Sequence, residues 1–122
     1  MDTINTKYYV GFEGYPEIEF ICVSYDGKKD ILSMWDGYFD SIMYSIEPKE
    51  SCWVGIAYTY HIDMPWFDES PWRIPNLKIV IEQLTEIDIN KLDDRTQEVL
   101  KDIIQLLSRA YNAKYMVFIS YN

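Results

Sequence analysis

The chain has 122 residues, of which 48% are hydrophobic and 16% aromatic, with only five glycines and five prolines. This length and composition predict one domain that spans residues 1–122 and has its own packed core, and they exclude a largely disordered chain. The net charge of −9 disfavours nucleic acid and anionic lipid partners, and it favours either a basic partner or simply high solubility.

The N-terminal third of the chain predicts two strands and leaves a third open. Residues Lys7–Glu13 and Glu17–Tyr25 both alternate apolar and polar side chains, and Gly14–Pro16 interrupts the alternation between them. Two such strands around a short connection predict an antiparallel hairpin. Asp26–Gly27 then predicts a tight turn, and a short third strand over Lys28–Leu32 remains open.

Residues Ser33–Ile46 predict a helix that begins near Ser33 and stops before Pro48. Asp36 would add a favourable acidic side chain to the first turn. Gly37 and the aromatic residues weaken a helix, so a strand remains the alternative for this segment. The apolar side chains at helical spacing are Trp35, Phe39, Ile42, Met43 and Ile46.

Residues Ser51–Ile62 predict the clearest strand, and its alternation puts His61 on the more polar face at the end of the strand. Asn76 predicts the N-cap of a helix over the apolar positions Leu77 to Ile87.

The C-terminal part of the chain predicts a long helix and a final strand. The helix begins with an Asp94/Gln97 capping pair and ends near Asn112. The strand Lys114–Tyr121 is apolar on both faces, which predicts an internal position in the sheet. The order β-β-α-β-α-α-β predicts an α+β domain whose mainly antiparallel sheet carries about three helices.

The residues needed for catalysis or metal binding do not form a recognisable pattern. His61 is the only histidine, and Cys22 and Cys52 lie in apolar strands, as expected of reduced, buried thiols. Zinc, EF-hand, phosphate-loop and dinucleotide motifs are absent from the sequence. We therefore expect a binding protein without enzymatic activity, cofactor or metal. The N-terminus lacks a secretory signal pattern, and no apolar run reaches the roughly 18 residues of a membrane span, so we expect a cytoplasmic protein.

The most unusual stretch is His61–Asn76, HIDMPWFDESPWRIPN. One interpretation is an aromatic anchor, with Trp66 exposed and Trp72 turned into the core, inside a rim formed by Asp63, Asp68 and Glu69. This composition is typical of a binding hot spot for a basic partner. The other interpretation is a structural cap, in which both indoles fold inward.

A family resemblance adds to these observations. The runs Trp53–Tyr58, Pro65–Trp66 and Trp72–Leu77, in a small acidic chain rich in Tyr and Trp, resemble the immunity proteins of bacterial polymorphic toxin and contact-dependent growth inhibition systems. The resemblance is one of overall pattern, and it implies a cytoplasmic inhibitor that binds a cognate toxin C-terminal domain, often a basic nuclease, in a fixed stoichiometry.

The candidate partner-binding residues are Asp63, Trp66, Asp68 and Glu69 in the loop and, if the loop is only a cap, Glu13, Glu17 and Glu19 near the N-terminus. Two other functions remain open. One is a small-ligand or carbohydrate module in which Trp66 and Trp72 stack on sugar rings, and the other is an adaptor subunit of another protein complex.

Overall fold

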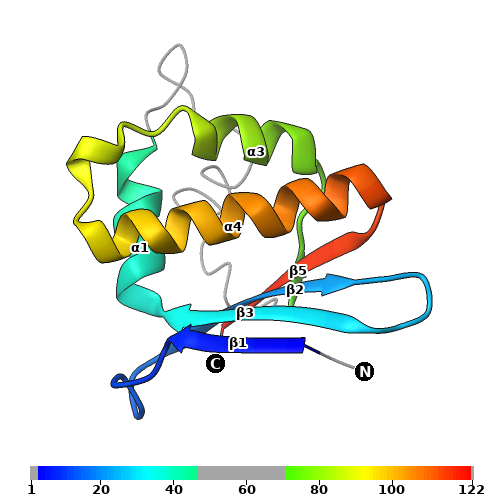
Figure 1. Cartoon of the computed structure of the whole chain (residues 1–122), viewed down its shortest axis with the longest axis horizontal. Helices are drawn as coiled ribbons and strands as arrows, with labels where there is room; N and C mark the ends of the chain where they lie inside the picture. Colours follow the sequence, from blue (N-terminus) through cyan, green and yellow to red (C-terminus); the bar gives the residue numbers. More distant parts are fainter. Residues whose placement is uncertain (1–2, 47–70, 122) are drawn as a thin grey trace.

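The computed structural model describes residues 3–46 and 71–121, which form a sheet covered on one side by helices (Figure 1). Over these residues the chain has a five-stranded, mostly antiparallel sheet and three α-helices, so the predicted α+β class is confirmed. The predicted strand Ser51–Ile62 lies outside the described residues. The elements are β1 Thr3–Tyr8, β2 Glu17–Val23, β3 Lys29–Trp35, α1 Asp36–Ser45, β4 Trp72–Arg73, α3 Leu77–Thr85, the short 3₁₀-helix η2 Ile89–Lys91, α4 Asp94–Ala113 and β5 Met116–Tyr121.

The strands lie in the order β1-β3-β2-β5-β4. β1 pairs with β3 in parallel, and the other neighbouring strands are antiparallel. β5 lies between β2 and β4, so the internal position predicted for the C-terminal strand is confirmed. The described helices all lie on the same side of this sheet (Figure 1).

The predicted hairpin between the first two strands is wrong. β1 ends at Tyr8, residues 9–11 form a turn, and Val10 is 69% exposed. The hairpin instead joins β2 to β3 through the predicted Asp26–Gly27 turn, where Gly27 has a φ of +86°. The reason is that β3 continues to Trp35, well beyond the predicted end at Leu32, and therefore offers β2 a full-length partner.

The helix predicted from Ser33 begins later, at Asp36. Ser33 is fully buried in β3, where its hydroxyl donates to the Glu17 carboxylate and does not cap a helix. Trp35 occupies the N-cap position without a side-chain capping bond. Pairing with β2 thus extends β3 through Ser33 and delays the start of the helix. Here the contacts between strands outweigh the local preference of these residues for a helix.

The core lies between the sheet and α4. α4 begins at the N-cap Asp93, whose carboxylate accepts from the Thr96 amide at 2.8 Å, so the predicted Asp94/Gln97 pair is one residue too late. Its C-cap is Lys114, and not Asn112, and Lys114 has a left-handed φ of 61°. The N-cap predicted at Asn76 is confirmed. The side chains that α4 buries are Thr96, Val99, Leu100, Ile103, Leu106, Leu107 and Ala110.

We expect a matched pair of substitutions on β5 to separate its two faces. Ile119 is 1% exposed in the core, so Ile119→Ala should lower the free energy of unfolding by about 2–5 kcal/mol. Met116 is 41% exposed, and Met116→Ala should cost less than about 1 kcal/mol. Urea denaturation of both variants measures the difference, and equal losses would contradict the assignment of the two faces.

Candidate functional site

The described residues do not assemble a catalytic or metal centre. Among residues 3–46 and 71–121, no group of three or more His, Cys, Asp or Glu side chains could hold a metal ion. Cys22 is buried as predicted, and burial raises the pKa of its thiol, which disfavours the reactive thiolate. Cys52 and His61 lie outside the described ranges.

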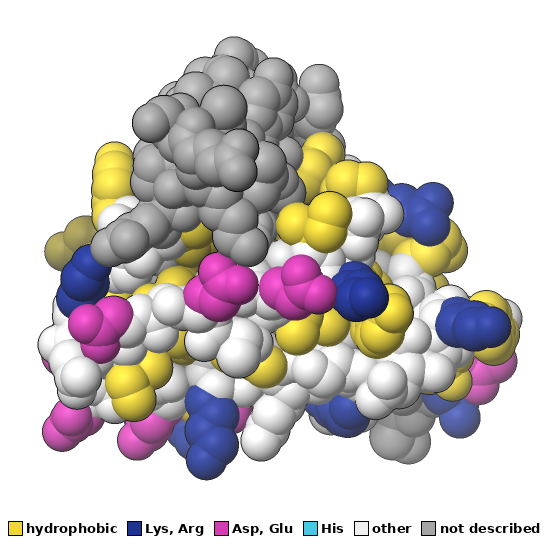
Figure 2. Space-filling model, turned by 90° about the horizontal axis from the view of Figure 1, so that it is seen from above, with side chains coloured by type: hydrophobic (Ala, Val, Ile, Leu, Met, Phe, Trp, Pro, Cys, Tyr) yellow, Lys and Arg dark blue, Asp and Glu magenta, His cyan; other side chains and the backbone are white. Residues whose placement is uncertain are grey.

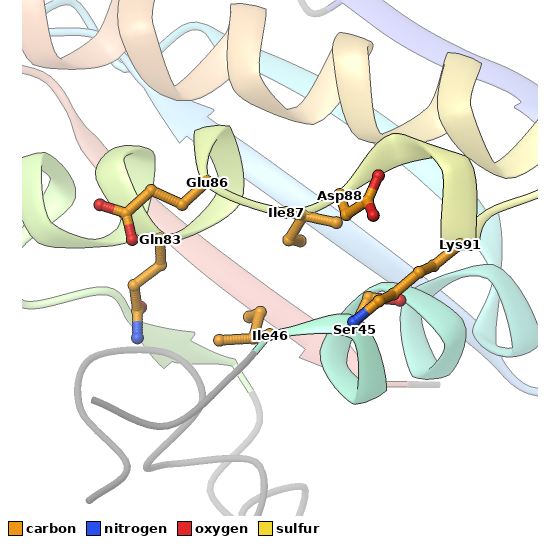
Figure 3. Close-up of a pocket in the computed structure, with 7 residues that line it drawn as sticks. All are labelled: Ser45, Ile46, Gln83, Glu86, Ile87, Asp88 and Lys91. Atoms are coloured by element: carbon orange, nitrogen blue, oxygen red, sulfur yellow. The ribbon is translucent and has the colours of Figure 1, made fainter. Parts of the chain in front are cut away.

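A pocket of about 210 Å³ lies between the end of α1 and the connection from α3 to η2 (Figure 3). Ser45 and Ile46 line one side, and the other side is lined by residues of mixed character. The Ser45 hydroxyl donates to the backbone carbonyl of Ser41 at 2.9 Å, so it is not aligned with a base. The pocket therefore lacks a nucleophile–base pair among the described residues. Its other lining residues are Gln83, Glu86, Ile87, Asp88 and Lys91.

Of the predicted partner-binding residues, Glu13, Glu17 and Glu19 are described, and Asp63, Trp66, Asp68 and Glu69 lie outside the described ranges. Glu17 and Glu19 lie on the sheet face opposite the helices, because they alternate with the buried residues of β2. Glu13 lies in the loop that precedes β2, where its carboxylate accepts from the Gly11 amide at 2.7 Å. The structure thus brings all three glutamates to the beginning of β2.

Trp72 is half-buried in β4 opposite Ile119, and it packs against the core, which agrees with its predicted inward orientation. This packing does not favour a sugar-stacking platform that needs an exposed Trp72.

Three aromatic side chains form a half-buried cluster beside these glutamates. Phe12 stacks on Trp35 with ring centroids 4.5 Å apart and an interplanar angle of 4°. The Tyr38 ring meets both of them edge-on, at 5.6 Å from Phe12 and 5.4 Å from Trp35. Gly37 makes this possible, because a Cβ atom at that position would lie 2.3 Å from the Trp35 indole. The cluster fixes the loop between β1 and β2 against the first turn of α1.

Two further acids complete the site. Asp36 donates its backbone N–H to the Pro16 carbonyl at 3.2 Å, which places it beside the start of β2. Burial raises the pKa of Asp36, and the nearby charge of Asp40 raises it further. Burial and the same two aspartates also raise the pKa of Tyr121. We call this surface the aromatic–acidic patch, defined by Phe12, Trp35, Tyr38, Glu13, Glu17, Asp36 and Asp40.

The patch lies at the end of the sheet where α1 begins, at the left of Figure 1, next to the loop that follows β1. The helix side of the molecule is different. Seen from that side, acidic and basic side chains are mixed with hydrophobic ones (Figure 2). The helix side of the molecule is therefore not uniformly acidic.

Five members of the patch are not among the binding residues predicted from the sequence. Phe12 falls in the predicted strand Lys7–Glu13, and the other four, Trp35, Asp36, Tyr38 and Asp40, fall in the predicted helix Ser33–Ile46. A usable signal was present, since acids follow aromatic side chains closely in the run WDGYFD at residues 35–40.

We expect the substitution Asp36→Asn to stabilise the fold at neutral pH. The raised folded-state pKa means that folding favours the protonated form, so the ionised carboxylate destabilises the native state above that pKa. The advantage of the variant should shrink as the pH falls through the Asp36 pKa, and it should vanish when Asp36 is protonated in both folded and unfolded chains. Thermal unfolding from pH 7 to about pH 3 measures this trend.

The control for this substitution is Asp94→Asn, which removes an exposed acid from the first turn of α4. This variant should lose about 0.3–1 kcal/mol of favourable interaction with the helix dipole and gain nothing. A pH-independent effect of Asp36→Asn, or a destabilisation equal to that of the control, would contradict the electrostatic strain at Asp36.

No described helix is both long enough and apolar enough to cross a membrane. No family model matches this chain, and neither a curated protein nor a solved structure matches it. The functional proposal is therefore based on the aromatic–acidic patch.

Proposed function

We propose that this protein is a stoichiometric inhibitor that binds a basic toxin domain through the aromatic–acidic patch. The observation that carries the proposal is the placement of Glu13, Glu17 and Asp36 around the stacked rings of Phe12 and Trp35. Among the described residues, none of these three carboxylates forms an ion pair with a lysine or arginine. A basic partner would supply the missing positive charge.

The electrostatics of Asp36 support a cationic partner. Its ionised form is disfavoured by burial and by Asp40, and a lysine or arginine at the interface would relieve both effects. Half-buried aromatic rings add apolar contact area, and an arginine can also stack on them. In protein–protein interfaces, a few residues contribute most of the binding free energy, and aromatic residues surrounded by a polar rim are often among them.

Two features of the sequence support a toxin domain as the partner. The net charge of −9 favours basic partners, and the runs Trp53–Tyr58 and Trp72–Leu77 resemble immunity proteins of polymorphic toxin systems. Such an inhibitor needs only to cover the active site or substrate surface of its target, so it needs no catalytic residues of its own.

The direct test uses the protein encoded immediately upstream of this chain. Its C-terminal domain is produced alone and together with this chain, and both growth of the producing cells and co-purification are measured. We expect the domain to stop growth, the chain to restore it, and the two to purify as a complex of fixed stoichiometry. An upstream product that is harmless or does not bind would contradict the proposal.

We expect the association rate with this domain to fall severalfold between low salt and about 0.5 M salt, because salt screens the long-range attraction. Glu13→Lys should slow association further at low salt. The matched control Glu82→Lys changes the net charge equally on the exposed surface of α3 and should have a smaller effect. Equal effects of the two variants, measured by stopped flow, would show that only net charge matters.

A further inference from the structure

A pocket of about 500 Å³ lies at the end of the molecule where α4 ends and α3 begins, at the right of Figure 1. Its volume falls within the range of about 300–1,000 Å³ that is typical of small-molecule sites. Two stretches of chain that are distant in sequence line it. One is β4 with the start of α3, and the other is the end of α4 with the start of β5.

The lining of this pocket is basic, although the chain as a whole is acidic. Arg73, Lys78 and Lys114 line it, all three are exposed, and none of its described lining residues is an Asp or Glu. The pocket beside the end of α1, by contrast, contains Glu86 and Asp88. Figure 2 shows Lys and Arg side chains next to hydrophobic ones at its right end, where α4 ends. Within the described part of the chain, none of the three basic side chains of the pocket forms an ion pair.

Local structure fixes two of these basic residues relative to the pocket. Arg73 pairs with Phe118 in the ladder between β4 and β5. Lys78 lies in the first turn of α3, and the Asn76 side chain fixes the start of this helix by accepting from the Ile79 amide at 3.3 Å. A lysine in a first turn lies beside the positive end of the helix dipole, and the first turn of α3 contains no acid. A bound anion would therefore stabilise Lys78 where it lies.

The third basic residue, Lys114, is held by hydrogen bonds on both sides. Its amide donates to the Tyr111 carbonyl at 3.2 Å, and its carbonyl accepts from the Tyr25 hydroxyl at 3.1 Å. Its φ of 61° lies in the left-handed region, where glycine and asparagine are favoured. The fold thus fixes the point at which the Lys114 side chain leaves the backbone, and such preorganisation lowers the cost of binding.

Tyr111 adds an exposed aromatic ring to the lining. Its side chain is 47% exposed, and no other ring in the described part of the chain contacts it. Tyr115, also in the lining, differs because it already packs edge-on against Tyr25, with ring centroids 5.1 Å apart. An exposed tyrosine ring can stack on a flat ring of a ligand. The pocket therefore offers both positive charge and a stacking surface.

We propose that this pocket binds a small organic phosphate that carries an aromatic ring, such as a nucleoside diphosphate. The phosphates contact Arg73, Lys78 and Lys114, and the ring stacks on Tyr111. Three basic side chains favour phosphate over a carboxylate, because a carboxylate carries one negative charge and a phosphate ester carries about 1.5–2 at pH 7. Arginine and lysine are also the side chains that commonly bind phosphate oxygens.

The net charge of −9 does not exclude this ligand. Salt screens exposed charges that lie more than about 8–10 Å away, so a ligand in the pocket responds mainly to the basic lining. A nucleic acid strand would extend beyond the pocket, where the acidic excess of the chain repels it. The aromatic–acidic patch lies at the opposite end of the molecule (Figure 1), so this site does not depend on the proposed inhibitor function.

The test is calorimetric titration of the purified chain with adenosine diphosphate, inorganic pyrophosphate and adenosine. We expect adenosine diphosphate to bind at one site with a dissociation constant below about 1 mM. Pyrophosphate should bind more weakly because it lacks the ring, and adenosine should not bind because it lacks the phosphates. A pentaglutamate peptide, which represents an acidic protein segment, should bind more weakly than adenosine diphosphate.

Substitutions in the lining test the basic residues. Lys78→Gln and Lys114→Gly should each weaken binding of adenosine diphosphate at least about tenfold, because a hydrogen bond to a charged group is lost. Glycine suits the left-handed φ of residue 114, so Lys114→Gly should be at least as stable as the parent in unfolding curves. The matched control Lys101→Gln removes the same charge from the exposed surface of α4 and should bind like the parent.

Tyr111→Ala tests the aromatic contact separately. It should weaken binding of adenosine diphosphate about fivefold or more and leave binding of pyrophosphate unchanged. The proposal is overturned if adenosine diphosphate does not bind at about 10 mM, or if it binds no more tightly than pyrophosphate or pentaglutamate. A loss of affinity in Lys101→Gln equal to that in Lys78→Gln would also overturn it.

Discussion

The structure depends on the burial of the α4 stripe against the middle of the sheet. Leu106, Leu107 and Ala110 are almost completely buried there, and the opposing side chains Phe20 and Ile119 are at most 1% exposed. Apolar surface removed from water stabilises the fold by about 25 cal/mol for each Å², and α4 buries more residues than any other described helix or strand. Because α1 and α3 pack on the same side as α4, the described helices cover only one face of the sheet (Figure 1).

This one-sided arrangement divides the described surface by physical character. The helix side mixes charges of both signs (Figure 2). The beginning of β2 gathers acids around stacked rings, where Asp36 is held at a cost to stability because burial and Asp40 both disfavour its charge. A half-buried acid whose charged form is disfavoured in the fold is typical of a functional surface, where binding takes precedence over stability.

The sequence by itself determined the elements with strong local signals. The apolar period of α4, the Asn76 cap, the Asp26–Gly27 turn and the apolar faces of β5 each act within a few residues, and the structure confirms them. Only the tertiary structure decided the pairing of β1 with β3, because a parallel ladder joins residues that no local pattern connects. It also decided that Ser33 belongs to a strand, since pairing with β2 outweighs a possible helix cap. The patch depends on both decisions: Glu13 and Glu17 could be predicted as acidic candidates, but their meeting with Trp35 and Asp36 required the chain to fold β3 beside β2.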